Sequence, residues 1–135
     1  MIAVLDFGGQ YAHLIARRFR DLHVSVRLFA HDVDASELAD VTGVVFSGGP
    51  TSVYAENAPT PKPAIFELGV PILGLCYGHQ FLARHFGGEV KSASKEYGEK
   101  TIDVLSAEGV LDGVAGKQKV WFSHGDTVLS VPAGF

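Results

Sequence analysis

The sequence is poor in cysteine, since Cys76 is the only one among 135 residues. A single cysteine excludes an internal disulfide framework and is typical of proteins in a reducing compartment. The sequence also has no apolar run of the roughly 20 residues that a membrane span requires. Its start, from Met1 to Asp6, lacks the charged segment that opens a signal peptide. We therefore expect a cytoplasmic protein that does not enter a membrane.

Positive charge is also scarce. Eleven Lys and Arg residues stand against fifteen Asp and Glu residues, which gives a formal net charge of −4. This mildly acidic balance provides no electrostatic basis for binding nucleic acid or an anionic membrane surface. The basic cluster formed by Arg17, Arg18 and Arg20 is predicted to be a solvated helix face. No histidine pairs with another ligand at zinc spacing, so we predict no metal site.

The hydrophobic pattern predicts one α/β domain over residues 1–135. A chain of this length, with 47% hydrophobic residues, can bury a single core. Short apolar runs predict strands at residues 2–6, 24–30, 41–46 and 71–75. Helical spacing predicts helices at residues 10–22, 64–68 and 77–86. In the first helix, the stripe expected to pack on the sheet consists of Tyr11, Leu14, Ile15, Phe19 and Leu22.

Two further stretches give weaker signals. Residues 32–40 are polar and rich in turn formers, and Ser36 is a possible helix cap there. After Gly88 the alternation of helix and strand ends. The remainder predicts short strands at residues 89–91, 100–105 and 119–122.

Cys76 lies at the predicted corner between strand 71–75 and helix 77–86. Gly74 and Gly78 flank it in a G-x-C-x-G pattern, the cysteine counterpart of the G-x-S-x-G nucleophile elbow. Helix dipoles at such a corner favour an anion, so we expect a lowered thiol pKa. The alternative is a small buried apolar residue. Because plain packing does not require glycine on both sides, we favour the elbow.

A second glycine loop, Ser47-Gly48-Gly49-Pro50, follows the predicted strand 41–46. Two glycines before a proline usually form only a turn, but here they can also bring backbone N–H groups close to a ligand. This loop and the Cys76 corner would leave the same carboxyl edge of a parallel sheet. Ligands of open α/β folds bind at that edge.

Five motifs, in this order, resemble the class I glutamine amidotransferase family. They are Leu-Asp-Phe-Gly-Gly-Gln-Tyr at 5–11, Phe-Ser-Gly-Gly-Pro at 46–50, Gly-Leu-Cys-Tyr-Gly-His-Gln at 74–80, Glu-Tyr-Gly at 96–98 and Trp-Phe-Ser-His-Gly-Asp at 121–126. The first, fourth and fifth are most similar to one branch, the glutaminase domains of GMP synthetases. The resemblance implies a flavodoxin-like fold: an open, mainly parallel sheet with helices on both faces.

The resemblance also implies a reaction and its residues. A Cys76 thiolate would attack the side-chain amide of L-glutamine, form a glutamyl thioester and release ammonia. Backbone N–H groups of Gly49 and Tyr77 would form the oxyanion hole. Gln80, Ser123 and His124 would hold the α-amino and α-carboxylate groups. No cofactor is expected in this chain. Ammonia would pass to the ATP-pyrophosphatase domain of a GMP synthetase, which uses ATP and magnesium to aminate XMP.

The chain departs from the family in one respect. The family activates its thiol with a histidine in a His-Pro-Glu motif, and this sequence contains none. We therefore expect a C-terminally incomplete domain, with an exposed apolar sheet edge prone to association and weak or absent turnover. His79 is not expected to replace the base, because the first helical turn points it away from the thiol. His124 is assigned to substrate binding.

Two alternatives remain open at this point. One is a non-catalytic module that binds glutamine or docks on a synthetase subunit. The other is an amidotransferase for a different acceptor, in anthranilate, carbamoyl phosphate or CTP synthesis. The motif at residues 5–11 argues against the second alternative, through the resemblance alone.

Overall fold

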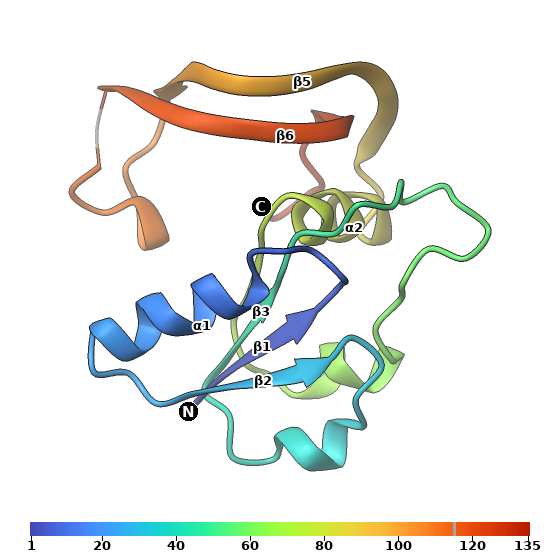
Figure 1. The fold of residues 1–135 in the computed structure, drawn as a ribbon, viewed down its shortest axis with the longest axis vertical. Coiled ribbons are helices and arrows are strands. Elements are labelled where there is room, and N and C mark those ends of the chain that lie inside the picture. The colour runs from blue at the N-terminus through green and yellow to red at the C-terminus, as the bar shows by residue number, and fades with distance from the viewer. Residues whose placement is uncertain (115) are drawn as a thin grey trace.

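The computed structural model describes residues 1–114 and 116–135, and it describes side chains except those at 93–96. Its centre is a four-stranded sheet in the order β2-β1-β3-β4. All three pairings are parallel (Figure 1). The strands are β1 (Ile2–Asp6), β2 (Val26–Ala30), β3 (Gly43–Phe46) and β4 (Ile72–Gly74). Every residue of β3 is buried, as expected of a strand covered on both faces.

Helices cover both faces of this sheet, which confirms the predicted fold class. On one face, Ala16 of α1 (Ala12–Asp21) packs with Val4 and Val45. On the other face, Leu82 of α2 (Tyr77–His85) belongs to a larger core that also includes Phe46. Two 3-10 helices, η1 (Ala35–Leu38) and η2 (Pro63–Glu67), add Leu38 and Ile65 to this core.

The buried face of α1 differs from the prediction. Tyr11, Leu14 and Leu22 are 54%, 44% and 72% exposed, whereas Ala12 and Ala16 are buried. Alanine lets a helix lie close to a sheet, so the small residues occupy the contact, while Ile15 and Phe19 are half-buried beside them. The three predicted solvent-facing arginines are indeed exposed.

The predicted cap at Ser36 is wrong. Ser36 lies inside η1, where the N-cap residue is Asp34 and no side chain caps the helix. The serine side chain is exposed.

The C-terminal part forms one long hairpin rather than three short strands. Strand β5 (Glu89–Val104) pairs antiparallel with β6 (Gly116–Ser130). Residues 89–91 and 100–105, which were predicted as separate strands, fall almost entirely within β5. Gly98 has φ +103, a conformation open to glycine, and β5 continues through it. The hairpin lies beyond α2, apart from the parallel sheet (Figure 1), and contacts α2 through both strands.

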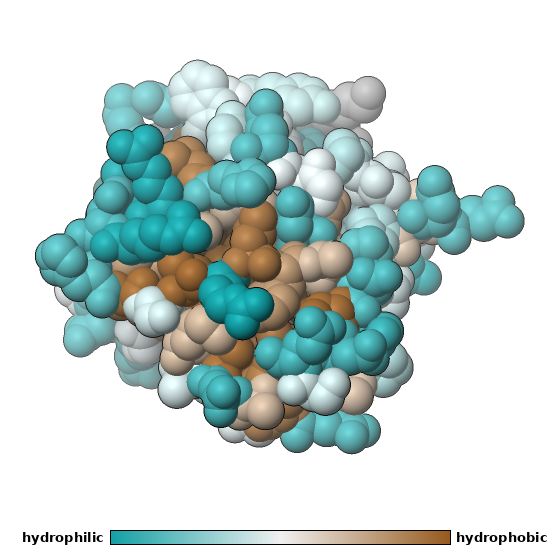
Figure 2. Space-filling model, turned by 60° about the horizontal axis from the view of Figure 1, so that its bottom comes forward, coloured by the Kyte–Doolittle hydropathy of each residue, from teal (hydrophilic) through white to brown (hydrophobic). Residues whose placement is uncertain are grey.

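Strand β4 forms one edge of the sheet among the described residues, and its residues are half-buried. Figure 2 shows apolar side chains gathered in a band between polar ones on one face of the molecule. Association through an apolar edge remains a prediction. Within the described residues, no helix is both long enough and apolar enough to cross a bilayer.

Candidate active site

The corner at Cys76 has the geometry of a nucleophile elbow. Cys76 has φ +53, a left-handed backbone conformation that residues other than glycine rarely adopt. A Cβ on Gly78 would lie 2.4 Å from the main-chain oxygen of Phe46, and one on Gly74 would lie 2.6 Å from the Gly78 carbonyl. Both flanking positions therefore require glycine, which explains the G-x-C-x-G pattern physically.

Hydrogen bonds fasten the elbow to the end of β3. The Leu75 N–H donates to the Phe46 oxygen at 3.0 Å, and the Gly78 N–H donates to the Ser47 oxygen at 3.1 Å. The Ser47-Gly48-Gly49-Pro50 loop consequently runs beside the thiol. A Cβ on Gly48 would lie 3.3 Å from that of Cys76.

The same loop also packs against the turn after β1. The buried Ser47 hydroxyl accepts a hydrogen bond from the Phe7 N–H at 3.0 Å and donates to the Gly48 oxygen at 3.0 Å. A Cβ on Gly49 would lie 2.5 Å from the Phe7 oxygen. The carboxyl ends of β1, β3 and β4 therefore meet at one place.

A cavity of about 990 Å³ opens over this place. It brings together five of the six predicted site residues in its lining: Cys76, Gly49, Gln80, Ser123 and His124. The sixth, Tyr77, has a fully buried side chain whose hydroxyl donates to the Pro59 oxygen at 2.7 Å. Burial raises the pKa of Tyr77 to about 12. Only the main chain of Tyr77 remains to serve the site, which is the role predicted for it.

The environment of the thiol corrects one expectation. The Cys76 Sγ donates to the Ser123 main-chain oxygen at 3.6 Å. Although the residue reaches solvent, enough protein surrounds the sulfur that burial raises the pKa of the Cys76 thiol, while a hydrogen bond from the Tyr77 N–H acts in the opposite direction. The predicted lowering of the pKa is therefore wrong, because desolvation outweighs the hydrogen bond from the Tyr77 N–H.

His79 lines the same cavity as Cys76, and that its side chain points away from the thiol stays a prediction. Burial lowers the pKa of His79, and the neighbouring His124 lowers it further.

Elsewhere, the His85 ring stacks on Phe66 with 4.2 Å between centroids. The described residues include no group of three side chains that could hold a metal ion.

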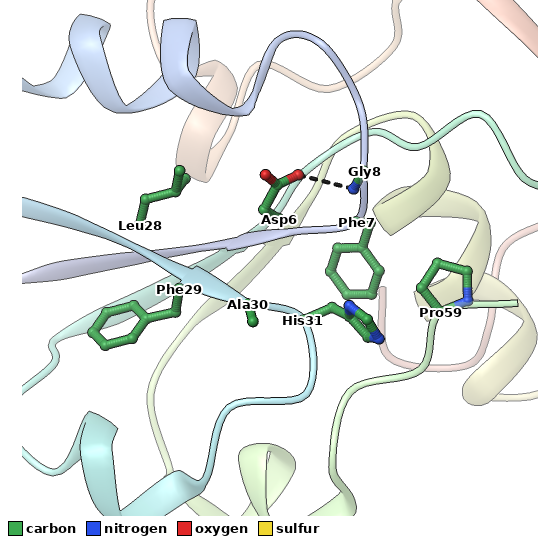
Figure 3. Close-up of a pocket in the computed structure, with 8 residues that line it drawn as sticks. All are labelled: Asp6, Phe7, Gly8, Leu28, Phe29, Ala30, His31 and Pro59. Carbon is green, nitrogen blue, oxygen red and sulfur yellow. Dashed lines mark hydrogen bonds between the residues drawn. The ribbon is translucent and has the colours of Figure 1, made fainter.

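A second hollow, of about 500 Å³, lies at the carboxyl ends of β1 and β2. Its walls are mostly apolar, and the rings of Phe7 and His31 lie 5.8 Å apart (Figure 3). The Asp6 carboxylate turns to the Gly8 N–H, from which it accepts a hydrogen bond at 2.8 Å. Asp6 therefore shapes the glycine turn, and no predicted site residue lies in this hollow.

Asp126 and its partners were not predicted from the sequence. The Asp126 carboxylate is buried and accepts hydrogen bonds from the Ser52 hydroxyl at 2.7 Å and from the Val53 N–H at 3.0 Å. The Gln80 Nε2 donates to the Asp126 main-chain oxygen at 2.6 Å. The acid closing the Ser-His-Gly-Asp motif was the available signal. In the Glu-Tyr-Gly motif, the side chain of Glu96 lies outside the described residues.

Comparison with known proteins extends over nearly the whole chain. The family model described as glutamine amidotransferase class-I matches residues 3–135. A glutamine-hydrolyzing GMP synthase from Geobacillus kaustophilus is 51% identical over 138 residues, which cover 100% of this chain and 27% of the relative. One from Exiguobacterium sibiricum is 50% identical with the same coverage. The chain thus spans about a quarter of the length of these curated relatives.

Solved structures agree with the family model. A protein from Thermoplasma acidophilum, described as one of the subunits of a GMP synthase, matches with a TM-score of 0.86 and 34% identity, over 98% of this chain and 68% of that one. A glutamine amidotransferase from Thermotoga maritima matches with a TM-score of 0.73 over 98% of this chain and 63% of that one, and at 21% identity it supports the fold alone. With the cysteine elbow and its cavity, these matches show that the chain belongs to the class I glutamine amidotransferase family.

Proposed function

We propose that this chain is the glutaminase part of a GMP synthase, also called GMP synthetase, and that it hydrolyses L-glutamine through Cys76. One observation carries the proposal: a cysteine at a strained elbow faces a cavity lined by Gly49, Gln80, Ser123 and His124. The function of the relatives, which are GMP synthases, supports the choice of branch.

The reaction follows from a cysteine nucleophile at this position. The Cys76 thiolate attacks the side-chain carbonyl carbon of glutamine and forms a carbon–sulfur bond. Collapse of the tetrahedral intermediate breaks the carbon–nitrogen bond, and the nitrogen leaves as ammonia after it takes up a proton. Water then attacks the thioester carbon, which releases glutamate and returns the thiol.

The intermediate bears a negative oxygen that needs fixed donors. We assign this role to the main-chain N–H groups of Gly49 and Tyr77. The Tyr77 N–H lies close enough to the sulfur to lower the pKa of the Cys76 thiol. Gly49 belongs to the loop that runs beside Cys76 and also lines the cavity. We infer that these two donors flank the place where the amide carbon would sit.

Gln80, Ser123 and His124 are assigned to the α-amino and α-carboxylate groups of glutamine. Gln80 supports this role in part only, because its Nε2 is engaged with the Asp126 main chain. Its amide oxygen remains to accept a hydrogen bond from an ammonium group. Ser123 and His124 lie on β6 and line the same cavity as Gly48 and Gly49.

Activation of the thiol is the step this chain supports least. Burial raises the Cys76 pKa, and the sequence has no His-Pro-Glu motif to take the proton. Loss of a general base typically costs about 10²–10⁴ in rate. We therefore propose weak or absent turnover by this chain alone. The ammonia would serve XMP amination in an ATP-pyrophosphatase domain, which binds ATP and magnesium, in the reducing cytoplasm that suits a lone thiol.

A glutaminase assay on the purified chain, with Cys76→Ala as the control, tests the proposal together with calorimetric titration of L-glutamine. We expect measurable binding of glutamine and slow ammonia release that Cys76→Ala abolishes. Release unchanged in Cys76→Ala would contradict the assignment of the nucleophile. Absence of glutamine binding would remove the glutamine site altogether.

The raised thiol pKa favours one second candidate, a module that binds glutamine without hydrolysing it. It predicts equal glutamine affinity in the wild type and in Cys76→Ala, with no ammonia release from either. Ammonia release that depends on Cys76 would therefore exclude this second candidate.

A further inference from the structure

Asp126 has no part in the chemistry proposed above, yet it is 4% exposed. A buried carboxylate is costly unless hydrogen bonds compensate it. Here the compensating donors are Ser52 and Val53, which lie 74 and 73 positions earlier in the chain. The Asp126 side chain therefore joins strand β6 to the loop that follows β3.

The two segments joined by Asp126 are the two walls of the proposed glutamine site. The loop held through Ser52 and Val53 also carries Gly49, which is assigned to the oxyanion hole. The strand that carries Asp126 also carries Ser123 and His124, which are assigned to the α-groups of glutamine. Cys76 lies between these walls, beside Gly48 on one side and the Ser123 oxygen on the other.

Other contacts fix the same loop from the opposite side. The Arg84 guanidinium on α2 donates to the Val53 oxygen and lies 4.5 Å above the ring of Tyr54. The Tyr54 hydroxyl donates to the Val90 oxygen on β5. The loop is thus held between α2 and the hairpin, and within this arrangement Asp126 forms its link to β6.

We propose that Asp126 is a positioning residue that couples the oxyanion loop to the glutamine-binding strand. The roles of these two segments rest on the proposed function. An ionised carboxylate accepts stronger hydrogen bonds than a neutral group, which suits a link that must hold two walls in register. Without it, the Ser52 hydroxyl and the Val53 N–H lose their buried acceptor, and the loop gains freedom to separate from β6.

The elbow does not depend on this link. Cys76 is placed by the bonds of Leu75 and Gly78 to the end of β3, and neither bond involves Asp126. Loss of Asp126 should therefore weaken recognition of glutamine without slowing the reaction of the thiol with a small reagent. A residue that only stabilised the fold would change both properties together.

Hydrogen exchange on the full 135-residue chain tests the coupling. In Asp126→Ala we expect faster exchange, by about tenfold or more, in both residues 47–54 and residues 122–127. Asp126→Asn keeps an oxygen that accepts the two bonds and should stay within about threefold of the wild type. The matched control is Asp103→Ala, an exposed acid on β5 that should change neither segment. A change confined to residues 122–127, or to neither segment, would overturn the proposal.

If Asp126→Ala does not fold, Ser52→Ala decides the question. Removing this donor should speed exchange across the link, in residues 122–127 as well as in its own loop. Faster exchange in residues 47–54 alone would show that the loop and the strand are independent, and would overturn the coupling.

Labelling of Cys76 tests the consequence for the site. A chloroketone analogue of glutamine must be recognised by both walls, whereas iodoacetamide needs only an accessible thiol. We expect Asp126→Ala to slow the chloroketone about tenfold, whereas the iodoacetamide rate should not fall. Equal slowing of both reagents would overturn the positioning role. A wild type that reacts with iodoacetamide but not with the chloroketone would instead refute the proposed function, while the exchange result still decides the coupling.

Discussion

The sulfur of Cys76 lies 3.6 Å from the main-chain oxygen of Ser123, so the elbow of the parallel sheet and the antiparallel hairpin meet at the reactive atom. In this hydrogen bond the thiol donates to the strand assigned to glutamine binding. The site is therefore built between two separate sheets rather than within one.

The first prediction concerns the reactivity of the Cys76 thiol. Because burial raises its pKa, alkylation by iodoacetamide should rise with pH along a curve displaced above that of the urea-unfolded chain. The measurement is the alkylation rate against pH in both states. Coincident curves, or a folded-state curve at lower pH, would contradict the effect of burial.

The same shift has a consequence for stability. A raised folded-state pKa means that the neutral thiol stabilises the fold at pH values below the unfolded pKa. This contribution is lost as the pH rises through the folded-state pKa. Cys76→Ser should flatten that part of the stability profile in urea titrations, since a hydroxyl does not ionise in this range.

The second prediction concerns Gly78. Its added methyl group would lie 2.4 Å from the Phe46 oxygen, a backbone atom that cannot yield easily. We expect Gly78→Ala to lower the free energy of unfolding by about 3 kcal/mol or more, at the upper end of the range for overpacking. The matched control is Gly113→Ala, where positive φ is the only obstacle and about 1 kcal/mol is expected. If the two variants lost equal free energy of unfolding in chemical denaturation, the close approach of Gly78 to the Phe46 oxygen would be contradicted.

The third prediction concerns His79. Burial, and then the charge of His124, lower its pKa, so its NMR titration should fall below the usual value for histidine. His124→Gln removes the second cause and should raise the His79 pKa only in part. Because the folded-state pKa is depressed, His79 stabilises the fold above the unfolded pKa. That stability is lost as the pH falls through the folded-state pKa. A His79 titration at or above the ordinary value would contradict its burial.

The fourth prediction concerns Ser47. Ser47→Ala leaves the buried Phe7 N–H without its acceptor and should cost about 1–3 kcal/mol in the free energy of unfolding. Ser36→Ala is the control, because that side chain is exposed and makes no cap hydrogen bond, so the change should be within about 0.5 kcal/mol. Similar effects of the two substitutions in urea denaturation would contradict the role of Ser47.

Sequence reasoning predicted the parallel sheet and the elbow because both depend on local patterns. Buried strands such as β3 are continuous apolar runs. A strand that turns this tightly into a helix needs glycine at the position of Gly78, because a Cβ there would clash with the main chain. Packing is not local. The burial of Ala12 in place of Tyr11 depends on how closely α1 approaches the sheet.

Long-range contacts account for what was missed at the site. The partners of Asp126 lie more than seventy positions away, and no pattern of spacing indicates them. The prediction of a lowered thiol pKa was likewise wrong, because the helix terminus is visible in the sequence while the burial of the sulfur is not. The continuity of β5 through Gly98 was also not predicted, because it depends on pairing with β6, which lies far along the chain.

The central claim is that Cys76 is a nucleophile presented to glutamine, and a diazoketone that mimics glutamine tests it most directly. Mass spectrometry of the treated chain should show an adduct on Cys76, and L-glutamine, but not D-glutamine, should protect that residue. Labelling by iodoacetamide with no diazoketone adduct, or an adduct that L-glutamine does not prevent, would contradict the account.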